Sequence, residues 1–232
     1  MAGLNELLAE MEKLADPDNA KNLSWFFKTG KGEYGEGDVF IGIKVPVQRQ
    51  LAKKHSDLSL GEIGKLLDSK IHEHRLTGLI ILGSRFKKTR DPKIVRFYLS
   101  HLKRVNNWDL VDLSAPNILG EYVAENPKEK EILYKLVRSP SLWERRVAIV
   151  STFAFIRRGC LADTMKMAEI LLGDDEHLIH KASGWALREA GKHDAKALKS
   201  FLNRNAKTMP RTMLRYSIER LSGKERKNYM KK

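Results

Sequence analysis

The chain has 232 residues, 42% of them hydrophobic and 31% charged, which excludes a disordered protein and allows one or two domains with a sizeable core. A single cysteine, Cys160, excludes a disulfide framework and a zinc ribbon. The 43 lysines and arginines outnumber 29 acidic residues, and the formal net charge of +14 favours a polyanion such as nucleic acid or an anionic membrane surface. Charge alone leaves open a basic protein without such a partner.

The first residues, Met1 to Glu6, contain no basic region followed by an apolar one, so we expect no signal peptide. The longest apolar run, Leu79 to Leu82, is far too short for a membrane span. We therefore expect a cytoplasmic protein that does not contact a membrane.

Helix-start signals recur along the chain, whereas strand-like alternation is nearly absent. Pro46 suits a first helical turn, and Ser59 with Glu62 has the spacing of a capping box. Asp91 precedes Pro92 as an N-cap precedes a first-turn proline. The predicted helices are 3–14, 19–28, 46–55, 60–68, 72–88, 92–104, 107–125, 128–137, 141–157, 161–172, 175–190, 194–203 and 210–221.

The longer predicted helices begin near 72, 107, 141 and 175, at steps of about 35, 34 and 34 residues. A helix-pair period in the thirties is typical of an α-solenoid, and HEAT-like repeats fit better than tetratricopeptide repeats, whose consensus residues do not recur. The helices are too short for a coiled coil. We expect one all-α, HEAT-like solenoid with a concave DNA-binding face. It would comprise N-terminal helices with a glycine-rich loop (1–58), helix pairs (59–221) and a basic tail (222–232).

When the predicted long helices are aligned at equivalent positions, a charged residue recurs at one position in each, and we call this set the charge column. Its members are separated by 37, 34, 35 and 34 residues, and they are Arg75, Asp112, Arg146, Lys181 and Arg215. Equivalent positions of a solenoid form a row on one face, and a cationic row there is suited to following a phosphate backbone. The one carboxylate, Asp112, then lies among cations that favour its ionised form. A solvated row, or an Asp112–Arg146 pair with a structural role, is the alternative.

Tryptophans accompany this column. Trp108 lies four residues before Asp112, and Trp185 lies four after Lys181, so each shares a helical face with a column member. Indole rings around a carboxylate can bind a cationic group by cation–π contact. Trp143, three residues before Arg146, is more typical of a core residue.

Four motifs in this order resemble those of AlkD-type alkylpurine DNA glycosylases, the DNA alkylation repair family built from HEAT-like repeats. They are Phe40 to Pro46 with Arg49, Asn107 to Asp112, Leu142 to Ala148, and Gly184 to Glu189. The resemblance covers most of the chain. It implies that Asp112 is the catalytic aspartate and that Trp108 and Trp185 flank the lesion. It further implies that Arg146 is the active-site arginine, although a one-residue shift would exchange it with Arg145.

The resemblance implies a monofunctional glycosylase that removes N3- or N7-alkylated purines from duplex DNA and leaves an abasic site. We expect no metal and no cofactor, and a monomer whose partner is double-stranded DNA. Further DNA contacts are expected from basic residues of the column and the motifs: Arg75, Lys181, Arg215, Lys44, Arg49, Arg145 and Arg188. The alternatives are a non-catalytic HEAT-like solenoid that binds bent or branched DNA, and a scaffold for a protein or RNA partner.

Other motifs receive simpler interpretations. The run Gly30 to Gly35 spells a dinucleotide fingerprint, but it follows a predicted helix rather than a strand, so we expect a flexible loop. The segment 29–38 also departs from the family pattern. The pairs His72 with His74 and His177 with His180 are interpreted as packing or surface histidines rather than metal ligands. Asp109 is expected to be a helix-start residue, and the tail from Lys224 onward a frayed basic end.

Overall fold

The computed structural model describes residues 2–231, and these residues are mostly helical. Among them the only β-type pairing is an isolated bridge between Val39 and Ile71, so the expected all-α fold is confirmed. The α-helices are α1 (Ala2–Lys13), α2 (Pro17–Phe26), α3 (Val45–Lys54), α4 (Leu60–Asp68), α5 (His72–Thr89), α6 (Pro92–Ser100), α7 (Trp108–Ser114), α8 (Glu121–Glu125), α9 (Glu131–Leu136), α10 (Leu142–Ser151), α11 (Phe153–Ile156), α12 (Ala162–Ile170), α13 (His177–His193), α14 (Ala195–Asn205), α15 (Arg211–Ser217) and α16 (Gly223–Lys231). Shorter turns are η1 (Leu102–Arg104), the π-helical η2 (Pro116–Gly120), η3 (Pro127–Lys130) and η4 (Leu171–Gly173).

The helix starts predicted from local signals are present. At α4 the Ser59 side chain accepts from the backbone N–H of Glu62, whose carboxylate accepts from the backbone N–H of Ser59 at 2.8 Å. At α6 the Asp91 carboxylate accepts from the backbone N–H of Lys93 at 2.8 Å. Pro46 lies in the first turn of α3. These signals are local, which is why the sequence alone reveals them.

Two predicted helices are interrupted. The predicted helix 107–125 changes to a π-helical turn at Pro116, whose nitrogen has no hydrogen to donate to the preceding turn. The predicted helix 141–157 divides at Thr152, whose hydroxyl donates to the carbonyl of Ile149 at 2.7 Å.

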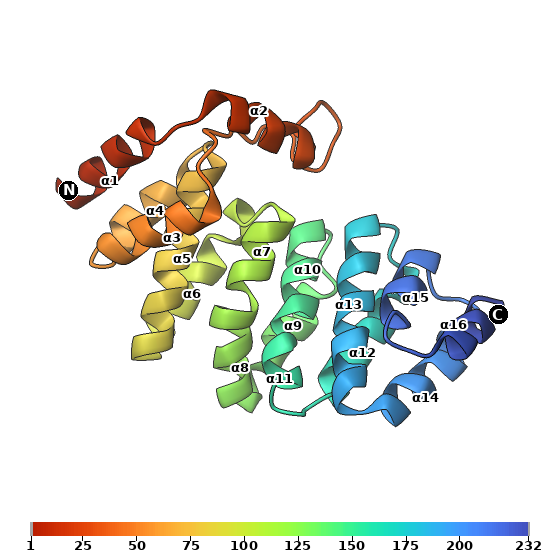
Figure 1. Cartoon of the computed structure of the whole chain (residues 1–232). Coiled ribbons are helices and arrows are strands. Elements are labelled where there is room, and N and C mark those ends of the chain that lie inside the picture. Colours follow the sequence, from red (N-terminus) through yellow and green to blue (C-terminus); the bar gives the residue numbers. More distant parts are fainter. Residues whose placement is uncertain (1, 232) are drawn as a thin grey trace. The chain divides into compact units, whose positions relative to one another are not determined.

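The chain divides into two compact units, Met1–Ser114 with α1 to α7 and Ala115–Lys232 with η2 to α16 (Figure 1). The expected division of one domain into 1–58, 59–221 and 222–232 stays a prediction. Among residues 2–231, no helix combines the length and the apolar character that a bilayer crossing requires.

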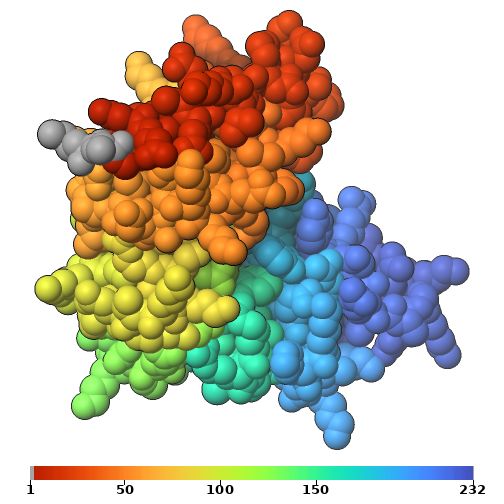
Figure 2. Space-filling view, turned by 60° about the vertical axis from the view of Figure 1, so that its left-hand side comes forward, coloured from red at the N-terminus to blue at the C-terminus, as the bar shows by residue number. Residues whose placement is uncertain are grey.

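In the first unit α5 packs against α3, α4 and α7. Its Leu79 and Leu82 are fully buried, and burying such a side chain contributes about 1.5–3 kcal/mol. Leu7 and Met11 of α1 are also fully buried. In Figure 2 the red surface of the N-terminal helices borders directly on the orange surface of the helices that follow.

The segment between α2 and α3 crosses the start of α2 at Gly42. Gly42 has a φ of 88°, and a Cβ there would lie 2.0 Å from the carbonyl oxygen of Asp16. The Asn19 side chain donates to the Gly42 carbonyl at 2.7 Å, and Glu73 of α5 accepts from the Gly42 N–H at 2.8 Å. The segment is thereby fixed against both α2 and α5.

In the second unit α13 packs against both α10 and α15 (Figure 1). The shorter helices α12 and α14 pack against α13 as well. The alternation of long and short helices agrees with the predicted helix pairs.

Gly184 of α13 permits close contact with α15. A Cβ at this position would lie 2.5 Å from the carbonyl oxygen of Met213 and 2.6 Å from the Cβ of Tyr216. We expect Gly184→Ala to lower the free energy of unfolding by about 1–3 kcal/mol, because the overpacked helices must separate. Urea unfolding measures this change. Gly173→Ala is the control, since a Cβ there meets nothing within 4 Å; equal losses in the two variants would contradict the packing argument.

The expected frayed basic tail is wrong, because residues 223–231 form α16. The backbone N–H of Ser222 donates to the Glu225 carboxylate at 3.1 Å, and the Glu225 N–H donates to the Ser222 hydroxyl at 3.3 Å. Glu225 also pairs with Lys199 of α14 at 2.6 Å. Tyr229 is buried, and its hydroxyl donates to Asn203 at 3.1 Å. These contacts hold α16 against α14.

Candidate functional site

Four members of the predicted charge column occupy equivalent helical positions. The fifth residue of each helix is Asp112 in α7, Arg146 in α10, Lys181 in α13 and Arg215 in α15. Arg75 is the fourth residue of α5. One residue turns a helix by about 100°, so Arg75 lies on a different side of its helix. Its assignment to the column is wrong.

The predicted DNA contact by Arg75 is also wrong. The residue is 2% exposed, and its guanidinium donates to Asp38 Oδ1 at 2.6 Å. It also donates to the carbonyls of Ser69 at 3.0 Å and Lys70 at 3.1 Å. Arg75 therefore holds the start of α5 to the segment before α3.

Arg145 makes the equivalent contacts in α10, where it is also the fourth residue. It donates to the carbonyls of Ser139 at 3.0 Å and Pro140 at 2.9 Å, and pairs with Asp174 at 2.6 Å. Arg145 is thus the counterpart of Arg75, and Arg146 belongs to the column. We do not retain Arg145 as a DNA contact, because Asp174 compensates its charge.

The remaining predicted DNA contacts differ in their surroundings. Arg188 is paired with Glu189 at 3.2 Å and with Glu219, so we do not retain it either. Lys44, the residue before α3, and Arg49, in the middle of α3, are exposed. Their contacts with DNA stay predictions.

Helix α7 carries both Trp108 and Asp112, which lie one turn apart and are half-buried. The Trp108 ring stacks on Phe27 with centroids 5.1 Å apart and planes at 14°. Phe26 contacts it edge-on at 6.0 Å. Sequence reasoning missed this support, although the run Trp25-Phe26-Phe27 at the end of α2 is the signal for it.

In the second unit, Arg146 is 5% exposed and donates to the carbonyl of Leu178 at 2.7 Å, so it is not the exposed cation that the column predicted. Lys181 and Trp185 lie one turn apart on α13, both half-buried. The Trp185 ring lies 4.3 Å from the ring of Phe153. Arg215 is exposed on α15.

Arg215 also lines a hollow between α15 and α16 with a volume of about 500 Å³. Its floor and rim include Ile218 and Met230, together with the cations Arg226 and Lys227. Three cations around one hollow suit an anionic group. The sequence did not reveal them, because the helical conformation of α16 was missed.

A buried polar cluster lies beside Trp108, and we name it the Asp38 cluster. It consists of Asp38, His72, Arg75, Asn107 and Asp109. Its contacts include His72 Nδ1 to Asp38 at 3.1 Å, His72 Nε2 to Asp109 at 2.8 Å and Asn107 Nδ2 to Asp38 at 3.2 Å. Burial raises the pKa of Asp38, but the hydrogen bond with His72 and the charge of Arg75 outweigh it and hold that pKa below its usual value. His72 and Asp109 are packing and helix-start residues as predicted, yet their pairing was not foreseen.

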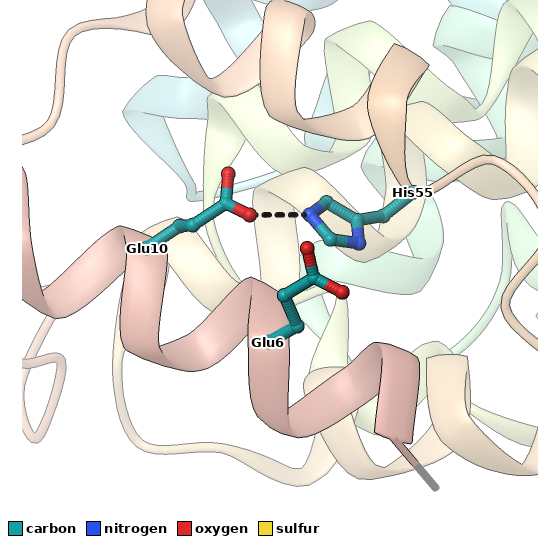
Figure 3. Close-up of side chains that lie close together, drawn as sticks. All are labelled: Glu6, Glu10 and His55. Carbon is teal, nitrogen blue, oxygen red and sulfur yellow. Dashed lines mark hydrogen bonds and ion pairs between the residues drawn. The ribbon is translucent and has the colours of Figure 1, made fainter.

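Glu6 and Glu10 of α1 lie beside His55, the residue after α3 (Figure 3). Their atoms are close enough to share a cation. The Lys54 ammonium already contacts Glu10 at 2.5 Å and Glu6 at 3.5 Å, and His55 Nε2 lies 3.2 Å from Glu10. The group is therefore an ion-pair network that holds α1 to α3.

The run Gly30 to Gly35 is not a nucleotide-binding turn. It follows α2 directly, and the next helix begins at Val45. Glu33 accepts from the backbone N–H of Gly30 at 3.0 Å, and Glu36 from that of Gly32 at 2.8 Å. The backbone N–H groups of Gly30 and Gly32 thus already donate to carboxylates, although a phosphate would need them as donors.

A family model described as DNA alkylation repair enzyme matches residues 7–221 of the chain. Among solved structures, the chain is similar to a predicted DNA alkylation repair enzyme from Enterococcus faecalis, with a TM-score of 0.74 and 18% identity over 90% of this chain and 97% of that one. It is also similar to AlkD2 from Streptococcus mutans, with a TM-score of 0.57 and 17% identity over 95% and 100% of the two chains. These structural similarities concern the fold alone. No curated protein matches the chain.

Proposed function

The chain belongs to the family of DNA alkylation repair enzymes, and on that premise we propose that it is a monofunctional DNA glycosylase for N3- and N7-alkylated purines. It hydrolyses the N-glycosidic bond in duplex DNA and leaves an abasic site. The observation that carries this proposal is the carboxylate Asp112 one helical turn from Trp108, at the helix position where α10, α13 and α15 carry cations.

The chemistry needs little more than a placed negative charge. Alkylation at N3 or N7 makes the purine cationic, so the base leaves as a neutral molecule without prior protonation. Positive charge then develops on the deoxyribose. The Asp112 carboxylate stabilises that charge and orients the attacking water. A second carboxylate acting as a general acid, as in many glycosidases, is not required.

The tryptophans present indole faces to the cationic sugar or base, and each cation–π contact stabilises that cation by about 0.5–2 kcal/mol. Trp108 stacks on Phe27 and the Trp185 ring contacts Phe153, so both rings are held before substrate binds. Arg146 places a positive charge beneath the surface. Such a charge attracts a nearby phosphate without direct contact, because coulombic attraction is weakly screened away from water.

The cations Lys181 and Arg215 are the proposed phosphate contacts of the second unit. We expect Lys181→Ala with Arg215→Ala to weaken duplex DNA binding and to reduce the slope of log K against log salt by about 0.9 per lost contact. Binding titrations at several salt concentrations measure the slope. Lys196→Ala with Lys207→Ala is the control, since both are exposed cations outside the column. An unchanged slope in the first double variant would exclude these contacts.

The proposal is tested with an end-labelled duplex that carries one 7-methylguanine at a known position. Alkali after incubation cleaves the strand wherever an abasic site has formed. Cleavage at the lesion alone is the expected result. Tight binding without cleavage would favour the non-catalytic DNA-binding alternative.

A further inference from the structure

The imidazole of His72 lies between two carboxylates. Its Nδ1 is 3.1 Å from Asp38 Oδ2, and its Nε2 is 2.8 Å from Asp109 Oδ2. The side chains of His72, Asp38 and Asp109 are only 2%, 4% and 17% exposed. Water therefore has little access to any of the three groups.

Ionised carboxylates only accept hydrogen bonds, and a neutral imidazole has a single N–H. In a neutral His72, one ring nitrogen has no hydrogen, so its lone pair would face a carboxylate and no hydrogen bond would form there. Both contacts are satisfied only when His72 is an imidazolium ion. The Arg75 guanidinium pairs with Asp38 Oδ1, so the protonated cluster has two positive and two negative charges.

Burial lowers the pKa of His72, but the hydrogen bonds with Asp109 and Asp38 outweigh it and raise the pKa above its usual value of 6.5. The charged groups that face the ring are Asp38 from the segment before α3, Asp109 from α7, and Arg75 from α5, whose guanidinium lies 3.5 Å from Nδ1. Phe40 stacks on the ring at 4.6 Å, an arrangement that also favours a cation.

The cluster holds the residues on both sides of Trp108. Asn107 donates to Asp38 at 3.2 Å and accepts from the Trp108 backbone N–H at 2.8 Å. Asp109 accepts from His72 and from the backbone N–H of Leu110. A continuous set of ring contacts runs from His72 through Phe40 and Phe27 to Trp108. The backbone and the ring of Trp108 are thus both tied to His72.

We propose that His72 is a positioning residue which, as an imidazolium ion, joins Asp38 to Asp109 and thereby fixes Trp108 for base excision. The excision part rests on the proposed function. The effect has a definite sign: the stabilisation is complete below pH 6.5 and is lost as the pH rises through the raised pKa of His72. Excision therefore slows at alkaline pH while the cations that bind DNA remain charged.

The experiment combines NMR with excision rates between pH 6 and 9.5. In the wild type, ¹⁵N signals of the His72 ring are expected to show both nitrogens protonated at pH 7. His72→Gln, which can donate to only one carboxylate, is expected to lower the single-turnover rate roughly 10- to 100-fold. Its DNA affinity stays that of the wild type, and any alkaline decline of the wild-type rate follows the His72 signal.

His74→Gln is the matched control on the same helix. Burial lowers the pKa of His74 to about 4, so it is neutral throughout this range, and its ring lies by Ser69 rather than the carboxylates. Asp109→Asn keeps an acceptor oxygen but removes a charge, so the His72 signal is expected to titrate at lower pH. This variant and the wild-type spectrum test the proposal even if His72→Gln fails to fold.

The Trp108 indole N–H signal, assigned with Trp108→Phe, separates the two proposals. It is expected to move in His72→Gln and to stay in place in His74→Gln. If the Trp108 signal behaves in this way but the wild type releases no base, the glycosylase proposal is refuted, whereas the positioning of Trp108 by His72 is supported. A neutral His72 at pH 7, or wild-type rates in His72→Gln, would overturn the inference.

Discussion

Asp112→Asn is expected to slow base release about 100- to 1000-fold, the usual effect of removing one preorganised electrostatic group from an active site. Asparagine has nearly the shape of aspartate, so the fold of α7 is retained. The variant loses a negative charge from a protein whose net charge of +14 favours DNA, and its DNA affinity should therefore equal or slightly exceed that of the wild type.

Single-turnover rates and binding titrations on the same duplex separate chemistry from affinity. Asp57→Asn is the control, because Asp57 is an exposed aspartate between α3 and α4. If both variants excise at the wild-type rate, another group stabilises the developing charge. If Asp112→Asn no longer binds DNA, the residue acts in binding rather than in catalysis.

Arg75→Met is expected to lower the free energy of unfolding by about 3–5 kcal/mol, since it leaves the buried Asp38 carboxylate without its guanidinium partner. Methionine replaces much of the side-chain volume, so the loss is mainly electrostatic. The carbonyls of Ser69 and Lys70 also lose their donor. Urea unfolding at neutral pH measures the change.

The same variant distinguishes the buried role of Arg75 from the DNA contact that the sequence suggested. At temperatures where it is folded, the salt dependence of DNA binding should match that of the wild type. Lys44→Met, which removes an exposed cation, is the control for stability. A stable Arg75→Met protein with a reduced salt slope would restore the original prediction.

The starts of the helices depend on residues that are close together in the sequence. Ser59, Glu62 and Asp91 act within one turn, so the helix starts that they form could be predicted. Ser222 and Glu225 have the same capping-box spacing, and α16 was missed only because the basic composition of the tail suggested fraying.

The equivalent helix positions of Asp112, Arg146, Lys181 and Arg215 could be predicted because the helix-pair period repeats at 34 or 35 residues. The interval of 37 between Arg75 and Asp112 was the sign of an error in register. The position in α5 equivalent to Asp112 is Leu76, which is buried. A one-residue shift turns a side chain about 100° around the helix and so changes its neighbours.

The Asp38 cluster was beyond prediction from the sequence. Asp38 and His72 are 34 residues apart, and Asp38 and Asn107 are 69 apart. Both contacts join segments far apart in the sequence, and the bridge between Val39 and Ile71, together with the path of the backbone at Gly42, brings the segment before α3 to α5. Arg145 and Arg188 illustrate the same limit, since their partners Asp174 and Glu219 lie 29 and 31 residues away in the sequence.

The decisive measurement of glycosylase activity is the release of free 7-methylguanine or 3-methyladenine from alkylated duplex DNA, at moderate salt and with a chelator present. Free base is expected with the wild type and almost none with Asp112→Asn at equal DNA occupancy. Tight binding by the wild type with no free base at any enzyme concentration would contradict the proposed glycosylase activity.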